Sequence, residues 1–147
     1  MVQTIVNKEF ERLLTPGILK DINILVAEDD ETNFFLIKEY LEFSRANLHW
    51  AKDGKEATVI FDEIGSVNII LMDIQMPEMN GFEALKIIKS KSPNMPIIAL
   101  TAYAVSGDRE RGLKAGFNEY LSKPVSRKIL MELILKYIQN QPTSIIF

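Results

Sequence analysis

The sequence contains no cysteine and a single histidine, and these two shortages exclude several kinds of site. Without cysteine, the chain can form neither disulfide bonds nor thiolate metal centres. The one histidine, His49, cannot build a histidine-rich metal cluster. Any metal bound by this chain must therefore be a hard cation held by oxygen ligands.

Long apolar runs and clustered basic residues are also missing. No stretch approaches the roughly 20 apolar residues that cross a bilayer, and residues 1–14 lack the charged-then-apolar pattern of a signal segment. The net charge is −3, and the 17 lysines and arginines are scattered rather than gathered in a stripe. We therefore expect a soluble, cytoplasmic protein without membrane contact or direct nucleic-acid binding by this chain. A membrane anchor elsewhere in a parent protein stays open.

Short apolar segments alternate with amphipathic stretches along most of the chain. The segments expected to form strands are residues 22–27, 48–51, 67–72, 96–100 and 118–121. The stretches expected to form helices are residues 31–45, 54–64, 81–90, 106–115 and 126–139. Because parallel strands need a right-handed crossover connection, this alternation predicts a doubly wound α/β fold with a five-stranded parallel sheet and five helices.

The two ends of the chain fall outside this alternation. Residues 15–17 read Thr-Pro-Gly, a turn signal that separates residues 1–21 from the first expected strand. We therefore interpret residues 1–21 as a linker or N-terminal extension. Residues 22–140 form the expected domain, and residues 141–147 are a short C-terminal tail.

Acidic and basic side chains follow the expected strands, where ligand sites of open α/β sheets lie. Glu28, Asp29 and Asp30 follow the first strand, Asp73 the third, Thr101 the fourth and Lys123 the fifth. Taken alone, the three acids suit a solvated loop in which one caps the next helix, and Asp73 suits a turn that ends a strand. Thr101 alone suits a helix cap, and Lys123 alone suits a solvated side chain. Two carboxylates 4 Å apart repel by roughly 4 kcal/mol at an effective dielectric near 20, so together these acids favour a divalent cation. Oxygen ligands suit Mg²⁺ better than Zn²⁺.

Asp73 is the candidate nucleophile of this constellation. Beside a metal ion, its carboxylate can attack phosphorus and form an acyl phosphate, provided that the developing oxygen charge is stabilised. Thr101 and Lys123 are the candidate groups for that stabilisation. A haloacid dehalogenase-type phosphatase also forms an aspartyl phosphate, but it uses an acid two residues after the nucleophile, where this chain has Gln75.

The motifs at these strand ends resemble those of the response-regulator receiver domain, a flavodoxin-like fold. They are ILVAEDD at residues 24–30, LMDIQMPEMNG at 71–81, ALTA at 99–102 and YLSKP at 120–124. Four motifs in order are specific, and the resemblance covers about residues 22–140. The sequence of residues 99–108 and the presence of Asn33 are most similar to receivers of hybrid histidine kinases, many of which have Asn in place of Asp30.

The resemblance implies a role for each matched residue. Glu28, Asp29, Asp73 and the main-chain carbonyl of Gln75 would surround Mg²⁺, and Asp73 would accept the phosphoryl group from a phosphohistidine. Lys123 and Thr101 would bind the phosphoryl oxygens, and Tyr120 with Thr101 would form the switch. The resemblance also implies a cis bond between Lys123 and Pro124.

The expected partner is a histidine kinase dimerisation and phosphotransfer domain, or a histidine phosphotransfer protein. No independent enzyme is expected in this chain, beyond self-phosphorylation from donors and slow autodephosphorylation. A stand-alone response regulator is the alternative to a hybrid-kinase receiver. A binding-only pseudo-receiver is disfavoured, because the acceptor, the acid pair, Thr101 and Lys123 are all present.

Two aromatic residues of the first expected helix form a candidate docking surface. A stripe of Leu36, Ile37, Tyr40 and Leu41 is expected to face the sheet, which places Phe35 on the opposite side and Phe34 on its flank. Exposed aromatic side chains commonly anchor protein interfaces. The competing interpretation is that both phenylalanines pack under the segment before residue 22.

Overall fold

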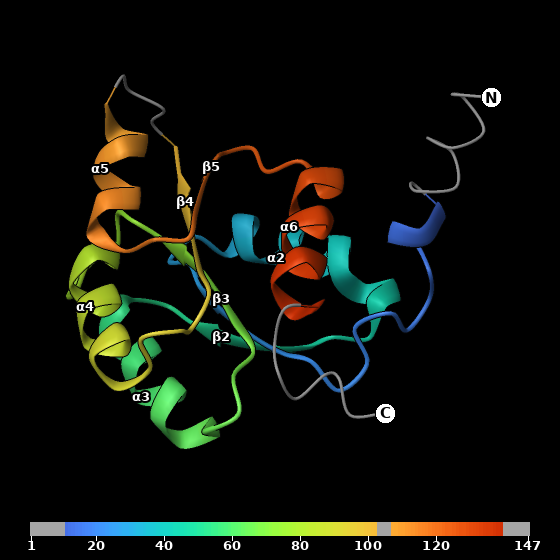
Figure 1. Cartoon of the computed structure of the whole chain (residues 1–147), viewed down its shortest axis with the longest axis horizontal. Helices are drawn as coiled ribbons and strands as arrows, with labels where there is room; N and C mark the ends of the chain where they lie inside the picture. Colours follow the sequence, from blue (N-terminus) through green and yellow to red (C-terminus); the bar gives the residue numbers. More distant parts are fainter. Residues whose placement is uncertain (1–10, 103–106, 140–147) are drawn as a thin grey trace.

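The chain forms a five-stranded sheet between two layers of helices (Figure 1). The computed structural model describes residues 11–102 and 107–139. The strands are β1 (Asn23–Ala27), β2 (Asn47–Ala51), β3 (Ile69–Asp73), β4 (Ile97–Thr101) and β5 (Glu119–Ser122). The α-helices are α2 (Glu31–Leu41), α3 (Gly54–Ile64), α4 (Gly81–Lys91), α5 (Asp108–Ala115) and α6 (Arg127–Gln139), and a 3-10 helix, η1, spans Glu42–Ser44.

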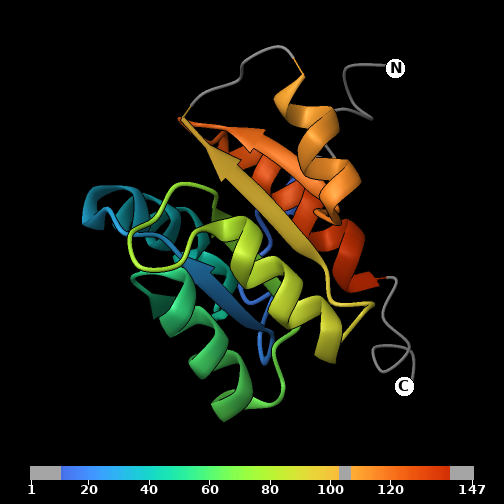
Figure 2. The same cartoon turned by 90° about the vertical axis from the view of Figure 1, so that its left-hand side faces the viewer.

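All five strands are parallel, in the order β2-β1-β3-β4-β5. The helices α2 and α6 lie on one side of the sheet, and α3, α4 and α5 lie on the other (Figure 1). Figure 2 shows α3 and α4 in front of the sheet and α6 behind it. The predicted doubly wound α/β fold is therefore confirmed.

Alternate residues of the central strands belong to two separate hydrophobic cores, one on each face of the sheet. Ile24, Val26 and Leu71 pack with α2 and α6, whereas Leu25 and Met72 pack with α3 and α4. Successive side chains of a strand point to opposite faces, and both faces here are covered by helices. The central strands are consequently apolar on both faces between their end residues, which is why they read as continuous apolar runs in the sequence.

Short polar side chains begin three of the helices. Asp30 accepts hydrogen bonds from the main-chain nitrogens of Thr32 and Asn33 at the start of α2. Asp53 and Asn80 cap α3 and α4 in the same way. Such caps satisfy amide groups that have no partner within the helix. The prediction that one of the three acids after β1 caps a helix is confirmed for Asp30.

The expected element boundaries differ from the observed ones by a few residues. The α-helix expected over residues 31–45 ends at Leu41 and continues as η1, before Arg45 adopts a left-handed conformation with φ of 59°. α5 begins at Asp108 rather than at residue 106, which lies outside the described residues. α3 begins and ends as predicted.

The segment before β1 packs against the domain. Leu19 is fully buried in the core beneath α2 and α6. The main-chain nitrogens of Gly17 and Leu19 donate hydrogen bonds to the carbonyls of Phe43 and Ser44. Core contacts therefore begin before residue 22, and the division into residues 1–21 and 22–140 stays a prediction. Residues 1–10 and the tail at 141–147 lie outside the described part of the chain.

Two further features of the sequence, its apolar content and its one histidine, can be placed in this architecture. No helix within residues 11–102 and 107–139 combines the length and the apolar character needed to span a membrane. His49 lies in β2, where its Nε2 atom is 3.3 Å from Oδ1 of Asn23. Because Asn23 is the first residue of β1, the His49 side chain points toward the amino-terminal ends of the strands, away from the residues that follow their carboxyl ends.

Candidate functional site

The candidate site lies at the carboxyl ends of β1 and β3, where the order of the strands reverses direction. Glu28 and Asp29 follow β1 directly, and Asp73 is the last residue of β3. One carboxylate oxygen from each of the three lies within 4.8 Å of the other two. Glu28 and Asp73 are buried, whereas Asp29 is exposed. The structure thus brings together the three carboxylates that the sequence predicts as metal ligands.

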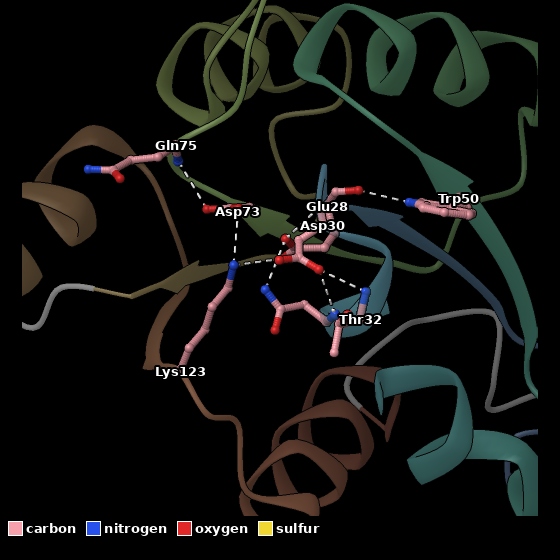
Figure 3. Close-up of polar contacts among 8 residues, drawn as sticks. Glu28, Asp30, Thr32, Trp50, Asp73, Gln75 and Lys123 are labelled. Carbon is pink, nitrogen blue, oxygen red and sulfur yellow. Dashed lines mark hydrogen bonds and ion pairs between the residues drawn. The ribbon is translucent and has the colours of Figure 1, made fainter. Parts of the chain in front are cut away.

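Lys123 reaches into this acidic cluster from the loop after β5 (Figure 3). Its Nζ atom lies 2.8 Å from Oε2 of Glu28 and 3.0 Å from Oδ2 of Asp73. The side chain is 15% exposed, so the ammonium group is largely withdrawn from solvent. Lys123 therefore offsets part of the negative charge of the buried Glu28 and Asp73 carboxylates.

The donor set fits a small divalent cation. Oε2 of Glu28 is buried, and its partner among the described residues is the ammonium group of Lys123, 2.8 Å away. Three carboxylates against one ammonium group leave an excess of negative charge at the site, which favours the binding of a divalent cation. Three oxygen ligands from two adjacent loops leave room for water, as Mg²⁺ prefers.

The site changes the proton affinity of its own groups. Burial raises the pKa of Asp73 to about 6, with a further contribution from the charge of Glu28, while contacts with Lys123 and the Gln75 amide oppose the rise. For Lys123, burial lowers the pKa, but its contacts with Glu28 and Asp73 outweigh burial and leave the pKa raised. Lys123 therefore remains a cation beside the carboxylates.

The main chain after β3 closes tightly around Asp73. The nitrogen of Gln75 donates a 3.0 Å hydrogen bond to Oδ1 of Asp73, and the Gln75 side chain points away from the acids (Figure 3). The nitrogen of Gly81 donates to the carbonyl of Ile74. A Cβ atom at Gly81 would lie 2.6 Å from the carbonyl oxygen of Asp73. Only glycine permits so close an approach, so Gly81 helps to fix the turn that presents Asp73.

Thr101 and Tyr120 lie on the β4 and β5 side of the site. Thr101 is buried at the end of β4, and Tyr120 is half-buried in β5. Both line a pocket of about 500 Å³, and its other lining residues are Ile74, Gln75, Phe82, Lys86, Arg111 and Ala115. The nitrogen of Lys123 donates to the carbonyl of Thr101, which ties the two strand ends together. The Lys123–Pro124 bond is cis, as predicted.

The two phenylalanines of α2 have different surroundings. Phe35 is 50% exposed, as expected, but Phe34 is 6% exposed, so its expected position on the exposed flank is wrong. Phe34 stacks on Trp50 of β2, with ring centroids 4.3 Å apart and an interplanar angle of 4°. The buried stripe of α2 is Phe34, Ile37 and Leu41, because Trp50 extends the apolar surface that the helix covers.

Trp50 is a residue at the site that the sequence-based prediction did not identify. Its Nε1 atom donates a 2.8 Å hydrogen bond to the main-chain carbonyl of Glu28 (Figure 3). It is the one tryptophan of the chain and stands at the end of an expected strand, next to the ligand-bearing edge. That position was the available signal, but the sequence alone does not show which way the indole turns.

Comparison with known proteins identifies the family. A family model described as the response regulator receiver domain matches residues 24–135, more than half of the chain. Hybrid signal transduction histidine kinase I of Dictyostelium discoideum is 41% identical over 133 residues, which cover 82% of this chain. The chain spans 8% of that protein's length.

Two solved receiver structures have the same fold. The receiver domain of a sensor histidine kinase from Pseudomonas aeruginosa, determined with a magnesium ion in its active-site cleft, is 35% identical with a TM-score of 0.73, over 81% of this chain and 98% of that one. The receiver of the response regulator Ssk1 from Saccharomyces cerevisiae, crystallised with the histidine phosphotransfer protein Ypd1, is 30% identical with a TM-score of 0.76, over 84% and 94%. The family match, these relatives and the acidic site agree, and the chain belongs to the response regulator receiver domains of two-component signalling.

Proposed function

We propose that this receiver accepts a phosphoryl group from a phosphohistidine onto Asp73, with Mg²⁺ held by Glu28, Asp29, Asp73 and the Gln75 carbonyl. The observation that carries the proposal is the convergence of Glu28, Asp29 and Lys123 on the buried carboxylate of Asp73. Such an arrangement favours cation binding and can stabilise charge on an incoming phosphoryl group.

The reaction follows from the groups around Asp73. An Asp73 carboxylate oxygen forms a bond to phosphorus while the bond from phosphorus to the donor imidazole nitrogen breaks, and that nitrogen keeps the electron pair. Bound Mg²⁺ would supply neutralising charge for the carboxylates and the phosphoryl oxygens. Lys123, already 3.0 Å from Asp73, is placed to stabilise a phosphoryl oxygen, and Thr101 would stabilise another from the end of β4.

A small phosphodonor tests the acceptor without a partner protein. We expect intact-mass spectrometry to show one phosphoryl group on the wild-type protein after incubation with acetyl phosphate and Mg²⁺. Chelator or Asp73→Ala should abolish the added mass. Full incorporation in either case would contradict the proposal.

A matched pair of variants tests the ligand set. Asp29→Asn removes a proposed ligand, and we expect it to weaken Mg²⁺ binding at least tenfold, as loss of a direct ligand should. Asp30→Asn removes a neighbouring charge but keeps the helix cap, since Asn and Asp cap equally well. Asp30→Asn should change the Mg²⁺ affinity much less. Equal effects of the two substitutions would exclude Asp29 as a specific ligand.

Tyr120 and Thr101 are the proposed switch residues. Phosphorylation would draw Thr101 toward the phosphoryl oxygens, and Tyr120 would turn into the space beside it. The pocket that both residues line supports this movement, since it offers room next to the ring. Identical Thr101 and Tyr120 rotamers in the free protein and in a complex with a phosphate mimic would refute the switch.

The proposed setting is a phosphorelay within a hybrid histidine kinase, in the cytoplasm. The match to one short part of the Dictyostelium kinase supports this parentage. The Ssk1 receiver, crystallised with Ypd1, supports a histidine phosphotransfer protein as partner, and a stand-alone response regulator is the alternative setting. Sequencing the parent gene on both sides of this chain distinguishes them, because a hybrid kinase requires an upstream kinase region.

A further inference from the structure

Trp50 reaches the proposed metal site through a single hydrogen bond. Its Nε1 atom donates to the main-chain carbonyl of Glu28 at 2.8 Å, from the penultimate residue of β2 toward the loop after β1 (Figure 3). We propose that Trp50 is a positioning residue that holds Glu28 and Asp29 in the geometry that binds Mg²⁺. This inference rests on the proposed function, since it assigns a role toward the same cation.

The hydrogen bond acts on the peptide unit that joins the two ligands. The carbonyl of Glu28 belongs to the planar peptide that links the Cα atoms of Glu28 and Asp29. On the other side of Glu28, its main-chain nitrogen donates to the carbonyl of Ala51 at 2.9 Å. β2 therefore holds Glu28 from both sides, and the contact made by Trp50 also sets the direction in which Asp29 leaves the strand.

The Glu28 side chain has its own contacts, which do not replace this one. Its Oε1 atom accepts hydrogen bonds from the nitrogen of Asp30 at 3.2 Å and from Nδ2 of Asn33 at 3.4 Å. These bonds orient the Glu28 carboxylate, but they do not contact the peptide group between Glu28 and Asp29. Asp29 itself is exposed, so its direction depends on the backbone more than on packing.

The indole ring is in turn held firmly by its neighbours. Phe34 stacks on it with ring centroids 4.3 Å apart and the ring planes 4° from parallel. The ammonium group of Lys52 lies 5.1 Å from its centroid. Aromatic contacts of this kind limit the positions of the ring. The N–H group is thus presented to the Glu28 carbonyl by a fixed support, as outer partners of metal sites commonly are.

The presence of a single tryptophan allows a one-atom test. Growth of a tryptophan auxotroph on β-(3-benzothienyl)alanine replaces the indole N–H of Trp50 with sulfur while keeping the size and stacking of the ring. We expect calorimetric titration to show about tenfold weaker Mg²⁺ binding than in the wild-type protein, with the same fold by circular dichroism. Trp50→Phe, which also lacks the donor, should weaken Mg²⁺ binding to a similar or greater extent.

Two comparisons separate a positioning role from a merely structural one. Leu19→Ala removes core packing in the segment before β1, whereas the ligands lie at the carboxyl ends of β1 and β3, and we expect it to lower stability without changing Mg²⁺ affinity. Mg²⁺ affinity within twofold of wild type in both Trp50 replacements would overturn the inference, as would an equal loss in Leu19→Ala. Absence of Mg²⁺ binding by the wild-type protein would contradict the proposed function itself. Mg²⁺ binding by the wild type that is unchanged in both Trp50 replacements would contradict only the role of Trp50.

Discussion

At the scale of single residues, Lys123 places a positive charge on the carboxylates that a divalent cation would also need. Its ammonium group contacts Glu28 and Asp73 at 2.8 and 3.0 Å. A divalent cation that binds the same carboxylates must share them with this charge or displace it. The residue that is proposed to stabilise the phosphoryl oxygens is therefore also a competitor of the metal.

Replacement of Lys123 should separate these two effects. We predict that Lys123→Met raises Mg²⁺ affinity by about tenfold, because one buried positive charge beside the ligands is removed. The same variant should be phosphorylated more slowly by acetyl phosphate, since a group that stabilises the phosphoryl oxygens is lost. Calorimetry measures the first effect and intact-mass time courses the second. Weaker Mg²⁺ binding in Lys123→Met would contradict the competition.

Asp73 should make stability depend on pH in the absence of metal. Its pKa is raised by burial to about 6, so the folded protein holds the proton more tightly than the unfolded chain does. The stabilisation from this proton is complete below the ordinary pKa of an aspartate and is lost as the pH rises through about 6.

The variant Asp73→Asn tests this dependence, because its amide does not ionise. In chelator we predict that Asp73→Asn is more stable than wild type at pH 7.5 by on the order of 1 kcal/mol, after allowance for solvent screening at the open side of the site. The difference should shrink toward pH 5. Denaturant titrations at both pH values measure it, and a gain that grows as the pH falls would have the wrong sign.

Single residues differ in how far the sequence determines their roles. The clustering of Glu28, Asp29 and Asp73 was predictable, because the carboxyl ends of neighbouring parallel strands meet at one edge. The cap formed by Asp30 was predictable from local chemistry. The contact of Trp50 with Glu28 was not, since it depends on a side-chain rotation that stacking on Phe34 selects.

At the scale of the element, α2 carries both a buried aromatic residue and an exposed one. Its periodicity alone predicted that Leu36, Ile37, Tyr40 and Leu41 face the sheet, which holds fully for Ile37 and Leu41. Phe34 joins them because Trp50 of the neighbouring β2 provides a flat surface beside the helix. The periodicity of a helix does not include contacts with a neighbouring strand, so it could not predict that Phe34 packs on Trp50. Phe35 remains the candidate for partner docking.

Phe35→Ala tests the docking surface of α2. The side chain is 50% exposed, so its loss should cost little stability, whereas a buried interface anchor typically contributes more than 1 kcal/mol to binding. We predict roughly tenfold slower phosphotransfer from the partner protein at low concentration and an unchanged rate with acetyl phosphate.

The exposed Val59 on α3, which is 48% exposed, provides a matched control for Phe35. Val59→Ala should leave both rates unchanged. Equal slowing of both reactions in Phe35→Ala would indicate damage to the site through Trp50, which the Phe35 ring contacts edge-on. No slowing with either donor would remove Phe35 from the interface.

At the scale of the whole molecule, the alternating apolar pattern specifies the fold, and the ends of the domain are less well specified. Central strands that are apolar on both faces require helices on both sides of the sheet, and this requirement gives the doubly wound arrangement. The turn signal at residues 15–17 suggested a linker, yet Leu19 after that turn is fully buried. A single buried leucine outside any strand or long helix leaves no periodic signal, so its packing was not predictable.

Leu19→Ala tests whether the segment before β1 belongs to the folded unit. We predict a loss of about 2–5 kcal/mol in the free energy of unfolding, the usual cost of removing a fully buried leucine side chain. The exposed neighbour Lys20 is a matched control, and Lys20→Ala should change stability by less than about 0.5 kcal/mol. Chemical denaturation measures both variants. A similarly small change in Leu19→Ala would mean that the segment is dispensable.

The identity of the phosphoacceptor is tested most directly by chemical trapping. An acyl phosphate is reduced by borohydride to the alcohol, so a phosphorylated aspartate becomes homoserine while an unmodified carboxylate does not react. After phosphorylation by acetyl phosphate with Mg²⁺, followed by reduction and peptide mass spectrometry, we predict homoserine at position 73. The conversion should disappear in chelator. Homoserine at Asp29 or Asp30 with none at position 73, or conversion that is unaffected by chelator, would contradict the assignment.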